Sequence, residues 1–225
     1  LSCLLNFTLK ENLWLPQIPG YPLITLGGAV AANTHGKSSD THGTIRNQIK
    51  SILIFHKTHG WMSLSDKENK NIFDLTIGGF GLTGTIVNVE LELIEITGCN
   101  FTTTIEKVSS AKDAVEKLNN KDFSNLFSYS WNKTSNIKKF GEGLIFNNKV
   151  NENEKNLPIR KMNFKNKSLN KYFTFNLWNK YSIKFFQNLY YNYFTIYKNK
   201  TINDNYENVL FPYAGKETYF HMYGK

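Results

Sequence analysis

Apolar residues recur along the first half of this chain in patterns that predict several β-strands. Residues 51–57 and 61–64 are apolar runs on either side of Thr58-His59-Gly60, and this arrangement predicts a β-hairpin. Residues 86–96 alternate between apolar and polar positions, which is typical of a half-solvated strand. The apolar residues expected on one face of that strand are Val87, Val89, Leu91 and Leu93.

Other segments have the spacing of short helices and extended chain. Residues 23–26 are expected to form a short buried strand or extended segment, and residues 29–32 a short helix. Residues 109–120 have the period of an amphipathic helix, which Ser109 or Ser110 can cap. The residues predicted to share one face of this helix are Ala111, Ala114, Val115 and Leu118.

The second half of the chain adds further elements and completes an α+β pattern. Residues 128–132 and 143–147 are predicted to be strands, whereas residues 181–197 are apolar and aromatic on nearly every side. Helix and strand fit that last segment equally well. The chain has 225 residues, enough for one large domain or two small ones. Because the residue composition changes near Thr97-Gly98, we place a domain boundary there.

Positive charge is concentrated beyond this boundary. Residues 1–100 contain 7 basic and 8 acidic residues, whereas residues 101–225 contain 20 and 10. Ten of the basic residues and no acidic one lie in the window 155–200, together with thirteen aromatic residues. Three interpretations stay open: a solvated lysine face that follows codon usage, attraction to an anionic membrane surface, and attraction to nucleic acid. We expect no nucleic-acid partner.

Some classes of site and location are disfavoured by what the sequence contains. Cys3 and Cys99 do not resemble a disulfide framework. The predicted turn after His56 is expected to send its ring and that of His59 apart, and no metal site is predicted. No apolar run of about 18 residues and no leader is visible, so we expect a cytoplasmic protein, at most peripheral to the inner membrane.

Two glycine-rich segments contain the residues that best indicate a chemistry. The first is PGYPLITLGGAVAANTHGK at residues 19–37, and the second is TIGGFGLTGTI at residues 76–86. Glycines let a ligand approach the backbone, and successive amides at a turn can bind an anion. The second segment matches G-x-G-x-x-G by letter, but a strand pattern follows it where a nicotinamide-binding fold needs a helix. Neither segment is a phosphate loop of the P-loop type.

Taken together, the two segments resemble the FAD-binding domain of the p-cresol methylhydroxylase type, in the vanillyl-alcohol-oxidase superfamily of FAD-linked oxidases. Within it, oxidases of lipid-phosphate-linked pentoses and of aldonolactones are the most similar. The resemblance implies an α+β fold, with the second half of the FAD-binding domain at residues 1–97 and part of an α+β substrate (cap) domain at residues 98–225. It also implies that the chain is a piece of a longer protein and is inactive alone.

The resemblance places FAD and its reacting edge on particular residues. His35 and Lys37 would lie at the flavin edge where substrate enters, as the catalytic residues of this part of the chain. The alternative interpretations are purely structural: His35 would be a packing or capping residue, and Lys37 a solvated loop lysine. The residues implied to contact FAD are Gly20, Thr25, Gly27, Gly28, Ala31, Ala32, Thr34, His35, Gly36, Thr83, Gly84 and Ile86.

The cap domain carries weaker matches to the same family. Residues 127–133 are similar to its YSxAWxD stretch, with Lys133 at the position of the aspartate. Phe211-Pro212 and Tyr223-Gly224 are similar to parts of its FxPLD…WN…YG stretch, with Ala214 at the position of that aspartate and Tyr219 at that of the tryptophan. These departures bear on the identity of the substrate more than on the fold.

The activity implied is oxidation of a hydroxyl group of a sugar-like substrate by hydride transfer to FAD. A lipid-phosphate-linked pentose is the preferred substrate, an aldonolactone is the alternative, and the electron acceptor is not indicated. An interpretation from another class is a non-catalytic basic module for anionic lipid or nucleic acid, in which the glycine segments are structural. The binding-module interpretation does not explain why both glycine segments occur at this spacing.

Overall fold

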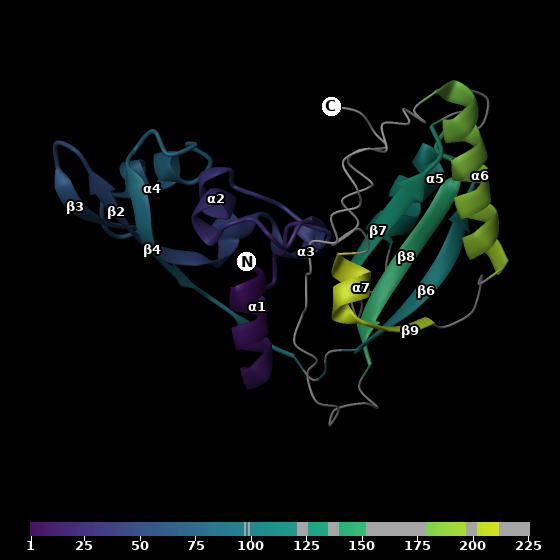
Figure 1. Ribbon diagram of the computed structural model, residues 1–225, viewed down its shortest axis with the longest axis horizontal. Coiled ribbons are helices and arrows are strands. Elements are labelled where there is room, and N and C mark those ends of the chain that lie inside the picture. Colours follow the sequence, from purple (N-terminus) through teal and green to yellow (C-terminus); the bar gives the residue numbers. More distant parts are fainter. Residues whose placement is uncertain are drawn as a thin grey trace, which may run out of the picture. The chain divides into compact units, whose positions relative to one another are not determined.

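The computed structural model describes residues 1–96, 98, 100–120, 126–134, 140–151, 179–196 and 202–211 of the chain. Within these residues the chain separates into two units, one ending at Ile96 and the other beginning at Gly98. Both units contain helices and antiparallel strands (Figure 1). The first unit contains α1 (Ser2–Thr8), a 3₁₀ turn (Leu9–Glu11), β1 (Leu13–Trp14), α2 (Leu26–Ala31), α3 (Ser39–His42), a second 3₁₀ turn (Ile45–Gln48), β2 (Ile49–His56), β3 (Gly60–Ser65), α4 (Lys70–Thr76), β4 (Thr85–Leu91) and β5 (Ile94–Glu95).

The core of the first unit forms around the β3-β2-β4 sheet. β2 pairs antiparallel with β3 through the predicted hairpin, which is confirmed, and pairs antiparallel with β4 on its other side. Side chains from the sheet and from α2 and α4 form one apolar cluster, which removes their surface from water. Its buried members are Ala29, Val30, Ile45, Ile49, Ile52, Ile54, Leu64, Phe73 and Ile77.

A β-bulge in β4 corrects the predicted alternation of residues 86–96. Ile54 of β2 pairs with Ile86 and Leu53 with Asn88, so Val87 is left without a partner in the ladder. The extra residue shifts the alternation by one position, because side-chain direction has a period of two. Ile86 therefore packs against the core beside Val89, and Val87 is exposed.

Two further predictions for the first unit are wrong in detail. The strand predicted to run to residue 96 ends at Leu91, and β5 after it pairs with β1 in a separate two-stranded ladder. Residues 23–26 are not a buried strand, because Leu23 is exposed and Leu26 already begins α2. The short helix predicted from residue 29 thus starts three residues earlier, where Thr25 supplies a cap.

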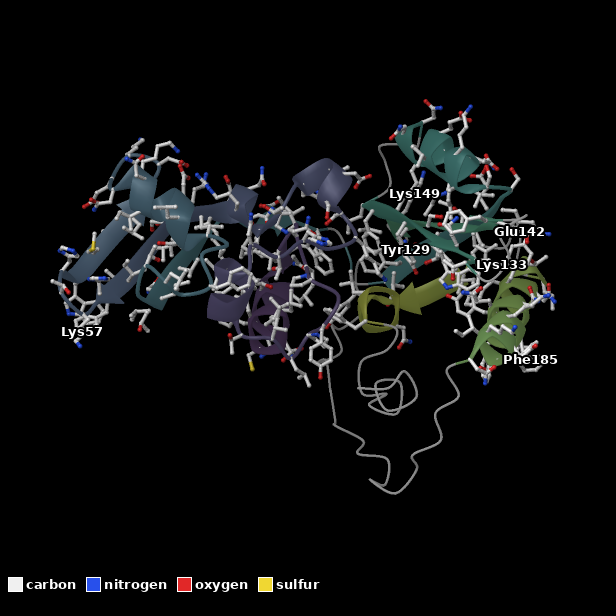
Figure 2. All side chains as sticks on the ribbon, turned by 90° about the horizontal axis from the view of Figure 1, so that it is seen from above. Lys57, Tyr129, Lys133, Glu142, Lys149 and Phe185 are labelled. Atoms are coloured by element: carbon white, nitrogen blue, oxygen red, sulfur yellow. The ribbon has the colours of Figure 1, made fainter. Side chains whose placement is uncertain are left out.

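The second unit is an antiparallel sheet with helices on both faces. It contains β6 (Asn100–Val108), α5 (Ala111–Asn119), β7 (Phe127–Asn132), β8 (Gly143–Val150), α6 (Lys180–Ile196), β9 (Ile202–Asn205) and α7 (Tyr206–Leu210). The strand order is β7-β8-β6-β9. α5 and α6 cover opposite faces of this sheet (Figures 1 and 2).

The helix predicted at residues 109–120 is confirmed with its cap. The Ser110 hydroxyl accepts a hydrogen bond from the Asp113 amide at 3.1 Å, and α5 follows at once. Ala114 and Leu118 pack against the sheet as predicted, but Val115 is exposed, because the apolar face is narrower than the sequence pattern indicates. The described part of the ambiguous segment 181–197 is helical and forms α6 up to Ile196, and one side of this helix packs on the sheet.

Several sequence predictions fall outside the residues that the structure describes. They include Ala214, Tyr219, Tyr223-Gly224 and most of the basic window 155–200. The strands predicted at 128–132 and 143–147 correspond to β7 and β8. Among the described helices, none is both long enough and apolar enough to span a membrane.

Candidate functional site

The two glycine segments lie side by side in the first unit. The Gly78 amide donates a hydrogen bond to the Val30 carbonyl at 3.1 Å, and the Phe80 amide donates to the Ala31 carbonyl at 2.9 Å. Both bonds connect the end of α2 to the loop between α4 and β4. Segments that are about forty residues apart in sequence therefore form one continuous backbone surface.

Thr25 sets the start of the helix in the first segment. Its hydroxyl oxygen accepts a hydrogen bond from the Gly28 amide at 3.0 Å, which satisfies one of the amides at the start of α2. A threonine hydroxyl has two acceptor lone pairs and one hydrogen. The same hydroxyl can therefore cap the helix and donate its hydrogen to a bound anion.

Several predicted site glycines are required by the fold itself. A Cβ atom added at Gly36 would lie 1.9 Å from the Ile18 carbonyl oxygen, so no other residue fits there. At Gly84, where φ is +136°, a Cβ atom would lie 2.7 Å from the Phe55 carbonyl oxygen. These two glycines allow close contact between parts of the backbone, whatever else they contact.

Gly20 and Gly27 have no comparable packing requirement. A Cβ atom at Gly20 would have no neighbour within 4 Å, and at Gly27 its nearest neighbour would be the Ile86 Cβ atom at 4.0 Å. Since the fold leaves open space above both positions, a flat ligand could approach the backbone there. The predicted site residues Gly27 and Ile86 are thus neighbours, although they come from different glycine segments.

Buried polar side chains hold the loop that contains His35 and Lys37. The Ser38 hydroxyl donates to the Pro16 carbonyl at 2.7 Å, and the Gln17 amide group donates to the Gly43 carbonyl. Gln17 is fully buried, so its amide forms this bond away from competing water. The loop is therefore fixed to the segment before the first glycine motif.

Lys37 and His35 lie in different environments on this loop. The His35 side chain is exposed, whereas Lys37 is half-buried. Desolvation lowers the pKa of the Lys37 ammonium from 10.5 to about 8. Lys37 is therefore mostly protonated at pH 7, with a proton that is easier to remove than that of an ordinary lysine. The alternative interpretation of Lys37 as an ordinary solvated loop lysine therefore does not apply.

Asn33 and Thr34 each bury a polar atom that has no hydrogen-bond partner among the described residues. These atoms are the Asn33 side-chain oxygen and the Thr34 hydroxyl oxygen. Asn33 also adopts a left-handed conformation with φ of +44°, which asparagine tolerates better than most residues. A buried polar atom without a partner costs free energy, so it requires an explanation. Asn33 was not among the predicted site residues, although it belongs to the motif.

Thr83 is committed to a hydrogen bond within the fold. Its hydroxyl oxygen lies 2.8 Å from that of Thr76, and the Thr76 hydroxyl donates its hydrogen to the Ile72 carbonyl at 2.6 Å. Because a hydroxyl has one hydrogen, Thr83 must be the donor to Thr76. Thr83 can therefore contact a ligand through its hydroxyl lone pairs or its backbone, and not as a hydroxyl donor.

The prediction that His56 and His59 point apart is wrong. Their rings are stacked with centroids 4.8 Å apart, because the His56 Nδ1 atom accepts hydrogen bonds from the amides of Thr58 and His59. These bonds fold the turn back over the His56 ring. Among the described residues, no group of three or more His, Cys, Asp and Glu side chains is placed to bind a metal ion.

In the second unit, Lys133 takes part in a buried ion pair that the sequence did not reveal. Its ammonium lies 3.1 Å from the Glu142 carboxylate and 3.8 Å from the centre of the Tyr191 ring. Burial and the Glu142 charge raise the pKa of the Tyr191 phenol. Figure 2 shows Lys133 and Glu142 next to α6. The family resemblance places an aspartate at this position. In this chain the lysine contacts Glu142 and the Tyr191 ring, and these contacts help attach α6 to the sheet.

Curated proteins match part of the chain, two of which are described below, and no family model matches it. Decaprenylphosphoryl-beta-D-ribose oxidase of Mycolicibacterium smegmatis is 31% identical over 94 residues, which are 41% of this chain and 20% of that protein. An uncharacterized protein encoded in the mprA 5′ region of Streptomyces coelicolor is 26% identical over 115 residues, which are 51% of this chain and 31% of that protein. The chain thus spans about a fifth to a third of the length of these two relatives. The first match indicates a distant relationship to an oxidase.

Proposed function

We propose that this chain is part of an FAD-dependent oxidoreductase that oxidises a hydroxyl group of a sugar-like substrate. The observation that carries the proposal is the direct pairing of the two glycine segments through Gly78 and Phe80. Each segment alone would be a common glycine-rich turn, but together they form one continuous backbone surface. The 31% identity to an oxidase over 94 residues supports the same conclusion.

The residues of this surface fit a large planar cofactor that carries a diphosphate. Gly20 and Gly27 leave open space over the backbone, and the Thr25 hydroxyl can donate to an anion. Asn33 and Thr34 each bury a polar atom without a hydrogen-bond partner among the described residues. A flavin ring edge carries both hydrogen-bond donors and acceptors and would supply such partners. When bound, FAD supplies the two-electron acceptor for the substrate. The remaining contacts would come from the backbone at Gly28, Ala31, Ala32, Gly36, Thr83, Gly84 and Ile86.

Lys37 and His35 have distinct roles in this proposal. Lys37, with a pKa of about 8, provides a positive charge at neutral pH that stabilises a negative group on the substrate or on the reduced cofactor. Gln17 and Ser38 keep its loop in place and so orient it. His35 is exposed and able to meet a substrate that arrives from solvent. A base for the substrate hydroxyl proton would lie elsewhere in the whole protein.

The preferred substrate is a pentose linked to a lipid phosphate, which is the substrate that the name of the mycobacterial relative describes. The charged Lys37 suits an anionic substrate of this kind. An aldonolactone is the alternative, and it carries no phosphate for Lys37 to bind. Lys37→Met should therefore raise KM for a phosphate-linked sugar much more than for a lactone.

The test is a visible absorption spectrum of the protein produced from its complete gene. We expect a flavin band that bleaches under anaerobic conditions when a substrate sugar alcohol is added. A folded, colourless protein that takes up no added FAD would contradict the proposal, and a basic, non-catalytic binding module would then be the better description.

A pair of variants makes this test specific to the glycine surface. Gly27→Val should lower the FAD content of the purified protein, because its side chain would fill the open space above the backbone. Phe7→Leu, in the exposed part of α1, is the matched control and should keep the cofactor. Thermal unfolding of both variants distinguishes loss of cofactor from loss of fold. Equal FAD content in a folded Gly27→Val protein would place the cofactor elsewhere.

A further inference from the structure

Helix α6 has two faces, and both carry large apolar side chains. One face packs on the β7-β8-β6-β9 sheet, where Trp131 and Phe146 contact the aromatic rings of Tyr190 and Phe194. The Lys133–Glu142 ion pair and the Tyr191 ring also hold this side of the helix to the sheet. The inner face therefore attaches α6 firmly and determines which residues point outward.

The outer face of α6 exposes six large apolar or aromatic side chains to solvent. Their exposed fractions range from 45% to 73%. Most are spaced by three or four residues, so they lie along one side of the helix. In Figure 2, Phe185 projects from α6 away from the sheet. The members of this outer face are Tyr181, Phe185, Phe186, Leu189, Tyr193 and Ile196.

An exposed row of this kind is unusual on a soluble surface. Single exposed apolar residues are ordinary, but a contiguous apolar patch marks a surface that contacts a partner or a membrane. α6 contains 17 residues, which corresponds to about 25 Å of helix. The outer face thus forms a long strip and not a pocket, so a flat apolar partner fits it better than a small ligand.

The charges on this helix favour an anionic partner. α6 contains Lys180 and Lys184 and no acidic residue. In the sequence it belongs to the window 155–200, which has ten basic residues and no acidic one. The aromatic rings of Tyr181 and Tyr193 combine an apolar body with a polar tip, which suits the boundary between water and lipid. Lysine stems can lie along apolar surface while their ammonium groups meet phosphates.

We propose that the outer face of α6 binds the protein to an anionic lipid bilayer, with the helix axis parallel to the membrane plane. The six side chains of the outer face would enter the headgroup and upper acyl region, and Lys180 and Lys184 would contact lipid phosphates. The helix remains attached to the sheet through its inner face, so it lies on the membrane and does not cross it. This proposal is independent of the proposed FAD chemistry.

The first experiment is sedimentation of the 225-residue chain with lipid vesicles. We expect the chain to bind vesicles of phosphatidylcholine containing about a third phosphatidylglycerol, and to bind pure phosphatidylcholine much more weakly. Binding should weaken in 1 M salt, where the screening length falls to about 3 Å. Equal binding to both vesicle types, or no binding to either, would overturn the proposal.

Variants identify the surface that binds. Phe185→Ser combined with Leu189→Ser should reduce the partition coefficient on anionic vesicles about tenfold or more, because both side chains lose their apolar contact. Trp61→Ser combined with Val115→Ser removes two equally exposed apolar side chains outside α6 and should leave binding unchanged. Circular dichroism and thermal unfolding establish that both double variants are folded. If the two double variants bind alike, α6 is not the membrane contact.

A second copy of the chain is the competing occupant of this face, and one more measurement separates it. Sedimentation velocity of the chain without lipid measures self-association. We expect either no dimer, or a dimer that Phe185→Ser/Leu189→Ser does not abolish. A concentration-dependent dimer lost in Phe185→Ser/Leu189→Ser, without vesicle binding by the parent chain, would assign the outer face to self-association and overturn the membrane proposal. Lys180→Gln with Lys184→Gln should weaken vesicle binding and reduce its salt dependence.

Discussion

The Phe80 amide donates its hydrogen to the Ala31 carbonyl across 2.9 Å, and this bond joins the two glycine segments of the chain. Ala31 lies at the end of α2 and Phe80 lies in the loop before β4. Since both partners are backbone groups, the pairing does not depend on the Phe80 side chain, which is 79% exposed. The pairing that forms the candidate cofactor surface therefore rests on main-chain geometry.

Position 36 should not tolerate a side chain, whereas position 20 should. Gly36→Ala places a Cβ atom against the Ile18 carbonyl oxygen, and we expect it to lower the free energy of unfolding by about 1–3 kcal/mol. Gly20→Ala, with open space around its Cβ atom, is the matched control and should change that free energy by less than about 0.5 kcal/mol. Urea denaturation of both variants checks the difference. Equal stability would mean that the loop containing His35 and Lys37 is not held against Ile18.

The half-buried, desolvated ammonium of Lys37 should make stability depend on pH. Its pKa is about 8 in the folded chain and 10.5 ordinarily, so the unfolded chain binds more protons between these values. The free energy of unfolding should therefore rise with pH from about 8 to 10.5, by at most about 1.4 kcal/mol per pH unit. Lys37→Met should remove this rise. Parallel urea titrations of the two proteins at several pH values measure it, and identical pH profiles would contradict the lowered pKa.

The bulge in β4 predicts opposite outcomes at two neighbouring valines. Val87→Lys should change the free energy of unfolding by less than about 0.5 kcal/mol, because the side chain is exposed at the bulge. Val89→Lys should lower it by about 2 kcal/mol or more, because Val89 packs against the core. Thermal or urea unfolding of the pair measures the contrast. A similar loss at both positions would restore the simple alternation read from the sequence.

The ion pair between Lys133 and Glu142 should matter far more than an ion pair on the surface. Lys133→Met should lower the free energy of unfolding by about 2 kcal/mol, since it leaves the Glu142 carboxylate in a largely dry site. Lys133→Met with Glu142→Leu should recover much of that loss. Lys112→Met, which removes an ion pair to Glu116 on exposed side chains, is the control and should have a negligible effect. Additive losses in the double variant would show that the two groups are not coupled.

The elements that depend on local pattern could be predicted from the sequence. The hairpin of β2 and β3 and the capped helix α5 were recognisable because each shows its period and its turn or cap within about a dozen residues. The same local view failed at the Val87 bulge, which is defined by a partner strand about thirty residues earlier. It also failed for the short pairing of β1 with β5, which has no pattern of its own.

The candidate site could be predicted in outline but not in its details. The motif letters indicated which glycines matter, but not that Gly36 and Gly84 are needed for packing against Ile18 and Phe55. No sequence signal showed that Thr83 donates its hydrogen to Thr76, because that depends on a third partner. The Asn33 side-chain oxygen is buried without a hydrogen-bond partner among the described residues, and this too could not be predicted. Burial depends on the tertiary structure, and the neighbouring residues in sequence do not indicate it.

The bulge at Val87 also affects how the chain behaves at high concentration. β4 is an outer strand of the β3-β2-β4 sheet within the described residues, and an outer strand can recruit a strand from another molecule. A bulge bends and twists such a strand and breaks its regular row of donors and acceptors. One extra residue therefore protects this unit against edge-to-edge aggregation. Deleting Val87 would straighten the edge strand and allow it to pair more readily with a strand of another molecule.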